Sequence, residues 1–388
     1  MWNVRESVKA VMPQVIAWRR HLHQHPELGL QETATTEFVA EALSSLGLEV
    51  TRFNQVTGVL GTLKGGLPGR TIALRADMDA LPIVEESDCQ FRSQNQGVMH
   101  ACGHDLHVSN LLGVASVLAA HRAELPGTVK LFFQPGEEGQ NGASHLIAEG
   151  VMEGVEQVYA LHVNSEIPTG QISMTPGYCT SNTDSAVVTV IGKGGHGAHP
   201  EQTVDALVVG AEIVGALQTI VSRNLPAQEA GVVTIGTFHA GTVQNIIAER
   251  SEMRLSLRSL TPETQAKLRD RIEALVKGIT AAHGADYRYE YKLGYPAVFN
   301  HEQAFATVQQ VASQVLGSEN VIINPKASMV GEDFAYYGQH VPATLFWLGA
   351  APADRSLQHP LHNPAVLFNE ECLPLGIEIM VNLVYQAQ

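Results

Sequence analysis

Hydrophobic residues in the first fifty positions recur every three or four residues, as they do along one face of a helix. They form two series, Val8 to Ile16 and Phe38 to Leu46. The segment between them contains Pro26 and Gly29, and both residue types interrupt regular structure. The pattern therefore predicts two helices separated by a loop.

Short apolar runs dominate the next part of the chain, where only one long stretch has helical spacing. That stretch covers about residues 105–121, with Val108, Leu111, Leu112, Ala115 and Leu118 on its apolar face. The strand-like runs cover residues 58–63, 71–75, 128–133 and 155–162. Strands that alternate with helices predict an α/β unit whose mixed sheet is largely parallel and flanked by helices.

The pattern changes near residue 183 and predicts a second, α+β unit. A strand over residues 184–191 leads through a Gly-rich loop to a helix over 204–221. Strands over 231–239 and 246–258, a helix over 261–282 and a strand over 286–293 follow. This β-α-β-β-α-β order is the ferredoxin-like motif. We therefore expect residues 183–293 to be a domain inserted into a discontinuous domain of residues 1–182 and 294–388.

Charge and composition narrow the class of protein. The 388 residues include 39 Asp and Glu against 24 Lys and Arg, for a formal net charge of −15. Such a surface repels nucleic acid and anionic membranes. No signal peptide is visible, and the longest apolar stretch, Leu111 to Ala120, is too short to cross a bilayer. Four scattered cysteines do not form a disulfide framework. We therefore expect a cytoplasmic protein with no nucleic-acid or membrane partner.

The segment from Met99 to His107 is the first candidate for chemistry. Cys102 and His104 stand two apart before the predicted helix, so a thiolate and an imidazole can converge on one metal ion. The helix N-terminus would favour the thiolate. His100 and His107 are further candidates, and a buried cysteine beside a capping Asp105 is the alternative.

Two adjacent carboxylates, Glu137 and Glu138, follow the apolar strand over residues 128–133. One of them could bind metal while its neighbour accepts a proton from a metal-bound water, as hydrolysis requires. A solvated acidic loop is the alternative for this segment taken alone.

Single histidines complete the set of candidates. His162 ends an apolar strand, and His359 and His362 lie in a loop stiffened by two prolines. A cysteine, several histidines and a carboxylate pair are mixed soft and hard ligands suited to a transition metal. Five ligands exceed one tetrahedral site, so two ions that share a ligand are expected, with zinc, manganese, cobalt or nickel compatible.

The glycines at Gly192 to Gly197 match a dinucleotide-binding pattern but lack its context. An acidic residue at the end of a second strand should follow about twenty residues later. Here that position lies inside the predicted helix, and Pro200 delays the helix start. We therefore do not expect NAD binding.

Together these segments resemble the metal-dependent aminoacylase/exopeptidase family, in particular its amidohydrolase branch of hippurate hydrolases and indole-acetyl-amino acid hydrolases. The likeness covers nearly the whole chain and is carried by several motifs in order: Arg19 to His23, Pro26 to Gly29, Leu74 to Pro82, Cys102 with His104, Gln134 to Gly139, Gly192 to Pro200, Gly331 to Phe334 and Leu361 to Pro364. In the wider family a His-x-Asp motif supplies one ligand, whereas Asp77-Met78-Asp79 stands at that place here.

The resemblance implies a role for each residue. Two divalent metal ions per subunit would be held by Cys102, His104, Glu138, His162 and His362. Glu137 would be the general base, and Asp79 would orient a ligand histidine from behind. The inserted domain would be a lid and dimer interface: His196 would stabilise the oxyanion in the partner subunit's active site, and Asn245 and Arg258 would hold the substrate carboxylate.

The sequence thus predicts a metal-dependent hydrolase that cleaves the amide bond of N-acyl amino acids and forms a homodimer. A metallo-carboxypeptidase or dipeptidase acting on short peptides is one alternative. A thiol hydrolase that uses Cys102 with His104 is another. A binding protein that keeps the fold without turnover is the third.

Overall fold

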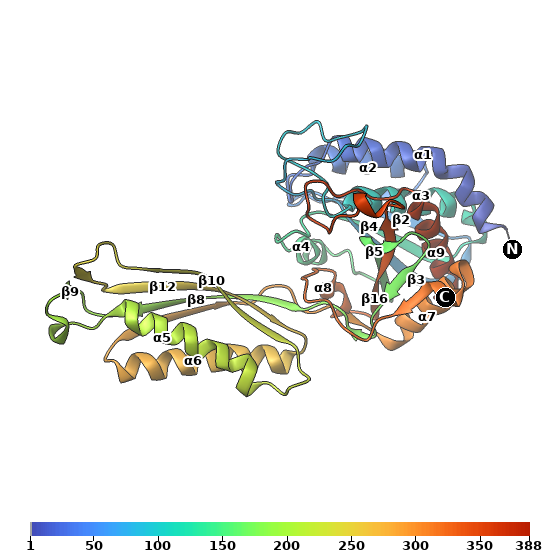
Figure 1. Cartoon of the computed structure of the whole chain (residues 1–388). Helices are drawn as coiled ribbons and strands as arrows, with labels where there is room; N and C mark the ends of the chain where they lie inside the picture. Colours follow the sequence, from blue (N-terminus) through green and yellow to red (C-terminus); the bar gives the residue numbers. More distant parts are fainter. Residues whose placement is uncertain (1) are drawn as a thin grey trace. The chain divides into compact units, whose positions relative to one another are not determined.

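The computed structural model describes residues 2–388, which divide into two compact units (Figure 1). The first contains residues 2–179, 298–326 and 333–388, and the second contains residues 180–297 and 327–332. The sequence pattern placed the domain boundaries at 182/183 and 293/294. In the structure, the boundaries between the two compact units lie at 179/180 and 297/298, and residues 327–332 pack with the second unit.

An eight-stranded mixed sheet forms the centre of the first unit. Its four central strands are β4, β3, β5 and β16, and each neighbouring pair among them is parallel. The full order is β1 (Glu49–Arg52), β2 (Val59–Lys64), β4 (Pro126–Gln134), β3 (Leu67–Asp77), β5 (Gln157–Pro168), β16 (Ala343–Ala351), β6 (Ile172–Met174) and β15 (Val321–Ile323). A separate pair joins β7 (Gly177–Tyr178) to β14 (Phe299–Asn300).

Helices cover both faces of this sheet because successive strand residues point to opposite sides. In β3, Ile72 and Leu74 belong to one buried cluster and Ala73 to the other. The first cluster packs against α1 (Val4–Gln24), α2 (Thr33–Ser45), α3 (His104–Ala120), α7 (Glu302–Leu316) and α9 (Cys372–Gln386). The second cluster packs against α4 (Gly142–Ala148) and α8 (Ala335–Gly338).

The second unit has a four-stranded antiparallel sheet with two helices on one face. Its order is β10 (Gly231–Ala240), β12 (Arg250–Ser259), β8 (Asn182–Ile191) and β13 (Asp286–Lys292), and the helices are α5 (Ala206–Thr219) and α6 (Pro262–Ala282). Each strand pair is antiparallel. The chain order β8-α5-β10-β12-α6-β13 with this sheet order is the ferredoxin-like arrangement.

Two of the predicted elements in this unit are different in the structure. The single strand expected over residues 246–258 is two strands, because β11 (Ile246–Ile247) pairs with β9 (Gly195–His196) and only then does β12 begin. The helix expected from Val204 begins at Ala206, where Asp205 caps it by accepting a hydrogen bond from the Leu207 amide.

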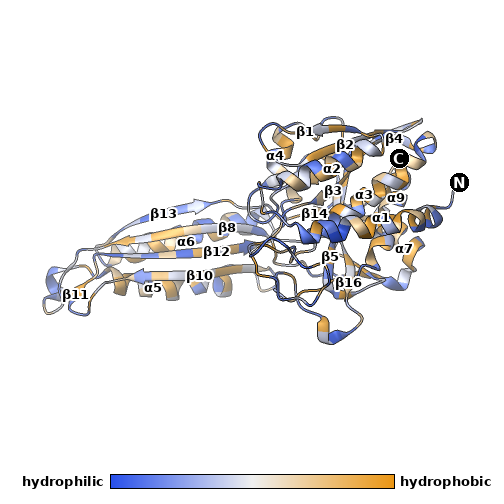
Figure 2. Cartoon of the chain, turned by 90° about the horizontal axis from the view of Figure 1, so that it is seen from above, coloured by the Kyte–Doolittle hydropathy of each residue, from blue (hydrophilic) through white to orange (hydrophobic). Residues whose placement is uncertain are grey.

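Among the described residues, one helical run is long and apolar enough to cross a membrane by length and composition alone. It covers Ala206–Asn224, and about a third of its most apolar 18 residues are buried inside the structure. The expectation of no such stretch rested on Leu111 to Ala120 and overlooked this one. In the structure Val209, Ile213 and Leu217 pack in the core of the second unit, while Leu207 and Val208 are exposed. Figure 2 colours much of α5 as hydrophobic.

Candidate active site

Cys102 and His104 lie at the start of α3, as their spacing indicates. Gly103 between them is the N-cap residue and has a φ of 92°, a left-handed conformation. A Cβ atom at Gly103 would come within 2.4 Å of a Val163 methyl group. Glycine is therefore the residue that fits here, and it turns the thiol and the imidazole toward the strand that carries His162.

Hydrogen bonds at one ring nitrogen orient two of the buried histidines. Nδ1 of His104 lies 2.8 Å from the Asp79 carbonyl oxygen, and Nδ1 of His162 lies 2.7 Å from the Val163 carbonyl oxygen. A carbonyl only accepts, so both Nδ1 atoms donate, and in the neutral form of each ring the lone pair is then on Nε2. Nε2 of His162 is 3.4 Å from Cys102 Sγ, and Nε2 of His104 is buried without a hydrogen bond among the described residues. These are the tautomers that metal ligands use.

Glu137 and Glu138 occupy the turn that follows β4. The Glu138 amide donates to Asp79 Oδ2 at 2.9 Å, so Asp79 contacts both the carboxylate turn and, through its backbone carbonyl, His104. Glu137 is 6% exposed, and the Asp333 amide donates to its Oε1 at 3.4 Å. The two carboxylates therefore have different surroundings although they are adjacent in sequence.

His362, rather than His359, reaches this cluster. Its Nε2 lies 3.0 Å from Glu138 Oε1, and its ring is half-exposed. Its backbone is left-handed, with a φ of 66°, and its amide donates to the Ala101 carbonyl at 2.9 Å. His359 instead contributes its carbonyl oxygen to a hydrogen bond from Ser165. The unusual backbone at His362 is held by the segment that carries Cys102, which fixes the histidine at the open side of the cluster.

The gathered donors fit a metal ion. Ligand atoms of Cys102, His104 and Glu138 lie within 4.8 Å of one another. His104 and His162 form a second group with Asp77 and His107, in which the four ligand atoms also lie within 4.8 Å of one another. Thiolate, imidazole and carboxylate in one buried cluster are the donor set of zinc, cobalt, nickel or manganese. Nε2 of His104 is buried without a hydrogen-bond partner among the described residues, and a bound cation would supply that partner.

The electrostatics of this cluster differ from the sequence expectation for Cys102. Burial and the carboxylates of Glu138 and Glu137 raise the pKa of the thiol well above its usual value. In the protein without a cation, burial and these carboxylates therefore favour the neutral thiol at Cys102. For His104, burial lowers the pKa, but Asp77 and Asp79 outweigh it and raise the pKa to about 10. The carboxylates thus give the cluster a negative electrostatic potential, which favours a positive charge at its centre.

A buried network beneath the cluster was not foreseen. Asp77 Oδ2 accepts from Arg75 Nη1 at 2.6 Å, and Asp77 Oδ1 accepts from His107 Nδ1. Nε2 of His107 accepts from the Val163 amide at 2.8 Å, so both ring nitrogens of His107 are used. His107 is therefore a structural residue in this arrangement. Arg75 and Asp77 stand in the buried half of β3, whose other residues from Ile72 on are apolar. Charged residues in such a run are the signal that indicates a buried ion-pair network.

Arg75 extends this network to a second carboxylate. Its Nη2 donates to Asp333 at 3.0 Å and its Nε to Gln134 at 2.9 Å. Gln134 in turn donates to Asp333, and the Ala143 amide donates to Asp333 Oδ2. These contacts join β3, β4 and the start of α4 around the turn that carries Glu137.

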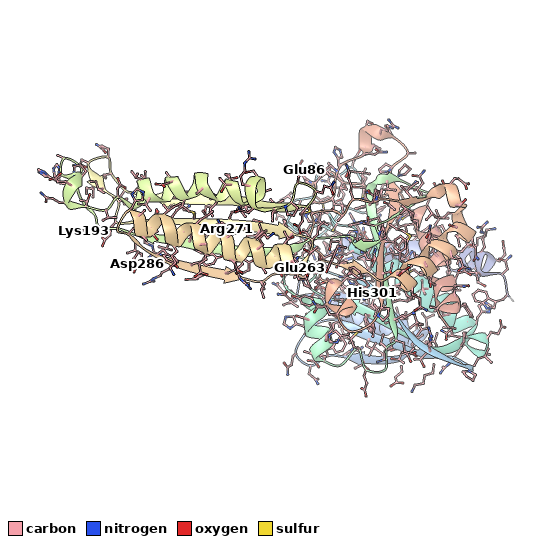
Figure 3. All side chains as sticks on the ribbon, turned by 90° about the horizontal axis from the view of Figure 1, so that it is seen from below. Glu86, Lys193, Glu263, Arg271, Asp286 and His301 are labelled. Carbon is pink, nitrogen blue, oxygen red and sulfur yellow. The ribbon has the colours of Figure 1, made fainter. Side chains whose placement is uncertain are left out.

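The remaining candidates lie in the second unit, at opposite ends of its sheet. His196 is in β9, and the Gly197 amide donates to the Asn245 carbonyl, so His196 and Asn245 are neighbours. Arg258 is near the other end of β12, eight residues after Arg250. Eight residues of strand span about 27 Å. Figure 3 labels Lys193 at the end that carries His196 and Glu263 at the end that carries Arg258.

Asn245 and Arg258 of one subunit are therefore not neighbours. Arg258 is partly buried, and burial lowers its pKa while Asp184 raises it. If both residues hold one substrate carboxylate, they come from two different copies of the chain.

Comparison with known sequences decides the family. Residues 73–386 match peptidase family M20/M25/M40. The chain belongs to this family. It is 43% identical over 303 residues to an N-acyl-L-amino acid amidohydrolase of Geobacillus stearothermophilus, covering 78% of this chain and 82% of that protein. It is 35% identical over 378 residues to thermostable carboxypeptidase 2 of Saccharolobus solfataricus, covering 96% and 95% of the two chains.

A solved structure extends the likeness to the fold. A Bacillus subtilis protein described as a dinuclear metal-binding peptidase of the M20 family superposes with a TM-score of 0.85. It is 31% identical and covers 97% of this chain and 98% of its own. The predicted family and the predicted α/β fold with a mostly parallel mixed sheet are confirmed. As a member of this family, the chain is a hydrolase of amide bonds.

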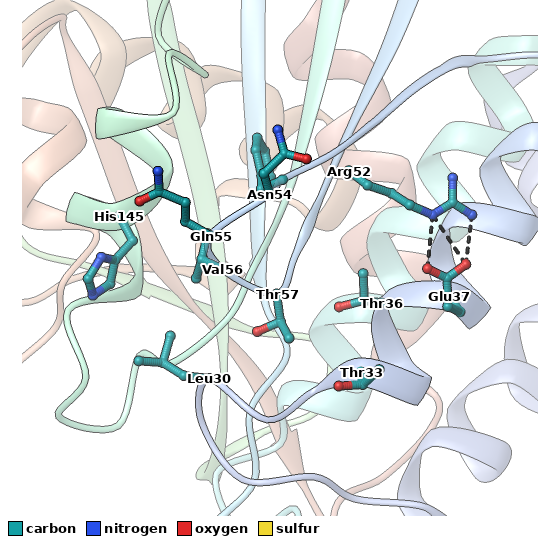
Figure 4. Close-up of a pocket in the computed structure, with 11 residues that line it drawn as sticks. Leu30, Thr33, Thr36, Glu37, Arg52, Asn54, Gln55, Val56, Thr57 and His145 are labelled. Carbon is teal, nitrogen blue, oxygen red and sulfur yellow. Dashed lines mark hydrogen bonds and ion pairs between the residues drawn. The ribbon is translucent and has the colours of Figure 1, made fainter.

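A cavity elsewhere in the first unit does not belong to this site. It has a volume of about 340 Å³ and is lined by Thr33, Thr36, Arg52, Thr57 and His145, among others (Figure 4). Arg52 at its edge is paired with Glu37 at 2.8 Å. None of the predicted ligands lines this cavity.

Proposed function

We propose that this protein is a metal-dependent amidohydrolase that cleaves the amide bond of N-acyl amino acids, such as hippurate-like or N-acetyl amino acids. The observation that carries the proposal is the convergence of Cys102, His104 and Glu138 with His162 and His362 on one cluster beside Glu137. The relative named as an N-acyl-L-amino acid amidohydrolase supports the choice of substrate class.

We assign the ligand roles to Cys102, His104, Glu138, His162 and His362. Their donor types would fit two divalent ions, zinc, manganese, cobalt or nickel. Such ions, when bound, supply Lewis acidity and a water of lowered pKa. Asp79 keeps the His104 ring in the tautomer that leaves Nε2 available, since its carbonyl accepts from Nδ1.

Glu137 does the proton transfer in this proposal. Its carboxylate accepts the proton of the attacking water and returns it to the departing amine. The Asp333 amide contacts Oε1 and so sets the direction of the carboxylate. Because Asp333 is itself held by Arg75 and Gln134, the base is anchored to β3 and β4 rather than to a free loop.

The second unit contributes through a dimer. The α5 residues Leu207 and Val208 are 43% and 53% exposed, and Ile246 is 55% exposed. A second copy of the chain that covers this apolar surface removes it from water. In such a homodimer we assign to His196 the stabilisation of the oxyanion in the partner subunit's active site. Asn245 and Arg258, which lie far apart within one copy, would hold the substrate carboxylate from two copies.

The test is amine release from N-benzoylglycine and from N-acetyl amino acids, before chelation, after it, and after each divalent ion is restored. Activity that disappears with the chelator and returns with one ion supports the proposal. Turnover that ignores the chelator contradicts it.

A metallo-carboxypeptidase that acts on short peptides is the second candidate, because one relative is named a carboxypeptidase. Dipeptides compared with N-acetyl amino acids that share the same C-terminal residue separate the two. A kcat/KM that is higher for the dipeptides favours the carboxypeptidase.

The thiol-hydrolase alternative is weakened by the environment of Cys102. A nucleophilic cysteine needs a lowered pKa, whereas burial and the neighbouring carboxylates raise the pKa of this thiol. Cys102→Ala should lose bound metal together with activity. Full metal occupancy in that variant would remove Cys102 from the ligand set.

A further inference from the structure

A second cluster of metal-binding side chains lies beside α1, outside the proposed ligand set. It consists of His23 near the end of α1, and Glu85 and Cys89 in the segment that follows β3; we call it the α1 cluster. One ligand atom from each residue lies within 4.8 Å of the other two. We propose that the α1 cluster binds a soft divalent transition-metal ion such as Zn²⁺.

The spacing of the donor atoms suits one ion. Nε2 of His23 is 3.2 Å from Glu85 Oε1. A tetrahedral zinc ion with bonds of 2.0–2.3 Å places neighbouring ligand atoms about 3.5 Å apart. Imidazole, carboxylate and thiolate therefore need only side-chain adjustments to reach a common ion.

The His23 ring is already oriented as a ligand. Its Nδ1 lies 2.8 Å from Asp105 Oδ2, and Arg19 Nε lies 3.0 Å from the same oxygen. With Nδ1 directed at a carboxylate, Nε2 faces Glu85. A carboxylate behind a histidine is the arrangement that orients metal-binding imidazoles.

Two of the three side chains of the α1 cluster are shielded from water. The His23 and Glu85 side chains are each 4% exposed. The Phe91 ring meets His23 edge-on at 5.5 Å between centroids, and the Arg19 guanidinium lies 4.4 Å from the centre of the same ring. His100, which is 2% exposed, has two ring nitrogens without a hydrogen bond among the described residues, and its ring centroid lies 6.5 Å from that of His23. A spare nitrogen donor is therefore present beside the cluster.

Protons compete with the ion. Burial lowers the pKa of His23, but Asp105 and the hydrogen bonds to Asp105, Cys89 and Glu85 raise it to about 10. An ion at this site replaces the Nε2 proton and the Cys89 thiol proton.

Binding here would connect α1 to the support of the active site. Pro364 stands two residues after His362, and its carbonyl accepts a hydrogen bond from the Glu86 amide at 2.8 Å. The Ser93 amide donates to Glu85 Oε2 at 2.7 Å. An ion at the α1 cluster thus ties α1 to the segment that supports the His362 loop.

The first experiment counts metal. The full-length chain is dialysed against a series of buffered zinc concentrations, and zinc per chain is measured by mass spectrometry. Cys89→Ser should bind one equivalent fewer than the natural chain at the highest concentration, while Asp88→Asn, a neighbour outside the cluster, should bind the same number as the natural chain. Equal zinc in all three proteins overturns the proposal. The difference does not depend on activity or on how many ions the active site holds, so it fails independently of the proposed function.

The second experiment needs no variant. Cys89 is half-buried, so iodoacetamide should alkylate it in the zinc-free chain, and peptide mass spectrometry locates the label. Saturating Zn²⁺ should slow alkylation of Cys89 at least tenfold, whereas Mg²⁺, which prefers oxygen ligands, should not. An unchanged rate with Zn²⁺ overturns the proposal.

Discussion

The two glutamates after β4 have the same chemistry but different neighbours, and the different tasks proposed for them rest on that difference. Glu138 lies 3.0 Å from His362 and is held at its amide by Asp79. Glu137 is buried and touched by the Asp333 amide. A residue's role at this turn therefore follows from which backbone and side-chain groups surround it, and substitutions should separate the two.

Glu137→Gln should keep the bound metal and lose activity by a factor of about 10² or more, because the amide cannot accept the proton of water. Metal content by mass spectrometry and kcat on an N-acetyl amino acid are the measurements. Glu149→Gln, on the surface after α4, is the control and should leave both unchanged. Near-normal turnover of Glu137→Gln would show that Glu137 is not the base.

Glu32 gives a pH-dependent prediction. It is fully buried, and burial, partly offset by the hydrogen bond from Thr57, raises its pKa to about 7. Because this folded-state pKa exceeds its usual value of 4.5, the folded protein binds the proton more tightly and loses stability as the pH rises from about 4.5 to about 7. Glu32→Gln lacks this loss.

The free energy of unfolding from urea titrations at pH 5 and pH 8 tests this expectation. The stability of Glu32→Gln relative to the natural chain should be higher at pH 8 than at pH 5. The isosteric amide still accepts the hydrogen bond that the Gly136 amide donates to Oε1. A stability difference that does not change with pH contradicts the assignment.

At the scale of an element, the start of α3 sets the geometry of the proposed metal-binding cluster. Gly103→Ala adds a methyl group that meets Val163 at 2.4 Å and forces a left-handed alanine. Gly150 has a similar φ of 88° but nothing within 4 Å of an added Cβ. Gly150→Ala should therefore cost about 1–2 kcal/mol of backbone strain.

Gly103→Ala should cost about 1–3 kcal/mol more than Gly150→Ala, since it also overpacks the core. It should in addition weaken metal binding, because Cys102 and His104 flank the shifted residue. Urea unfolding of both variants and metal titration of the purified proteins measure the two effects. Equal stability and metal affinity of the two variants would show that the close approach at Gly103 is absorbed without cost.

For the whole molecule, the exposed face of α5 is the surface that the proposed homodimer would cover. Val208→Glu places a charge on that face and should shift the chain toward a monomer in light scattering, with a large loss of kcat. Val84→Glu, at a residue that is 64% exposed in the first unit, is the matched control and should change neither. A Val208→Glu variant with unchanged mass and activity would contradict the interface.

Sharing of active sites between subunits has its own test. His196→Ala and Glu137→Gln should each be nearly inactive. If His196 acts in the partner subunit's active site, unfolding and refolding the two variants together creates hybrid dimers with one complete site. Recovery of roughly a quarter of the natural activity is expected for random pairing. No recovery would show that His196 does not act in the partner subunit's active site.

The sequence determined much of the local structure and the chemical inventory. Hydrophobic spacing located α1, α2 and α3 and the strands β2, β3, β4 and β5, because one face of each packs in a core. The chain after Tyr295, which contains β16, α7 and α9, had no predicted elements. The motifs identified Cys102, Glu137 and Glu138, since rare chemical groups at loop positions after strands are visible without a fold. The sequence analysis did not predict the break between β11 and β12. It also overlooked that Ala206–Asn224 is an apolar helical run long enough to cross a membrane.

Only the tertiary structure decided which groups meet. His362 and not His359 contacts Glu138, and both nitrogens of His107 are occupied while Nε2 of His104 is not. The Arg75 network and the α1 cluster join residues that are tens to hundreds of positions apart. Spacing along a chain reports which side chains share an element, but contacts across elements depend on sheet order and packing, and these appear only when the chain is folded.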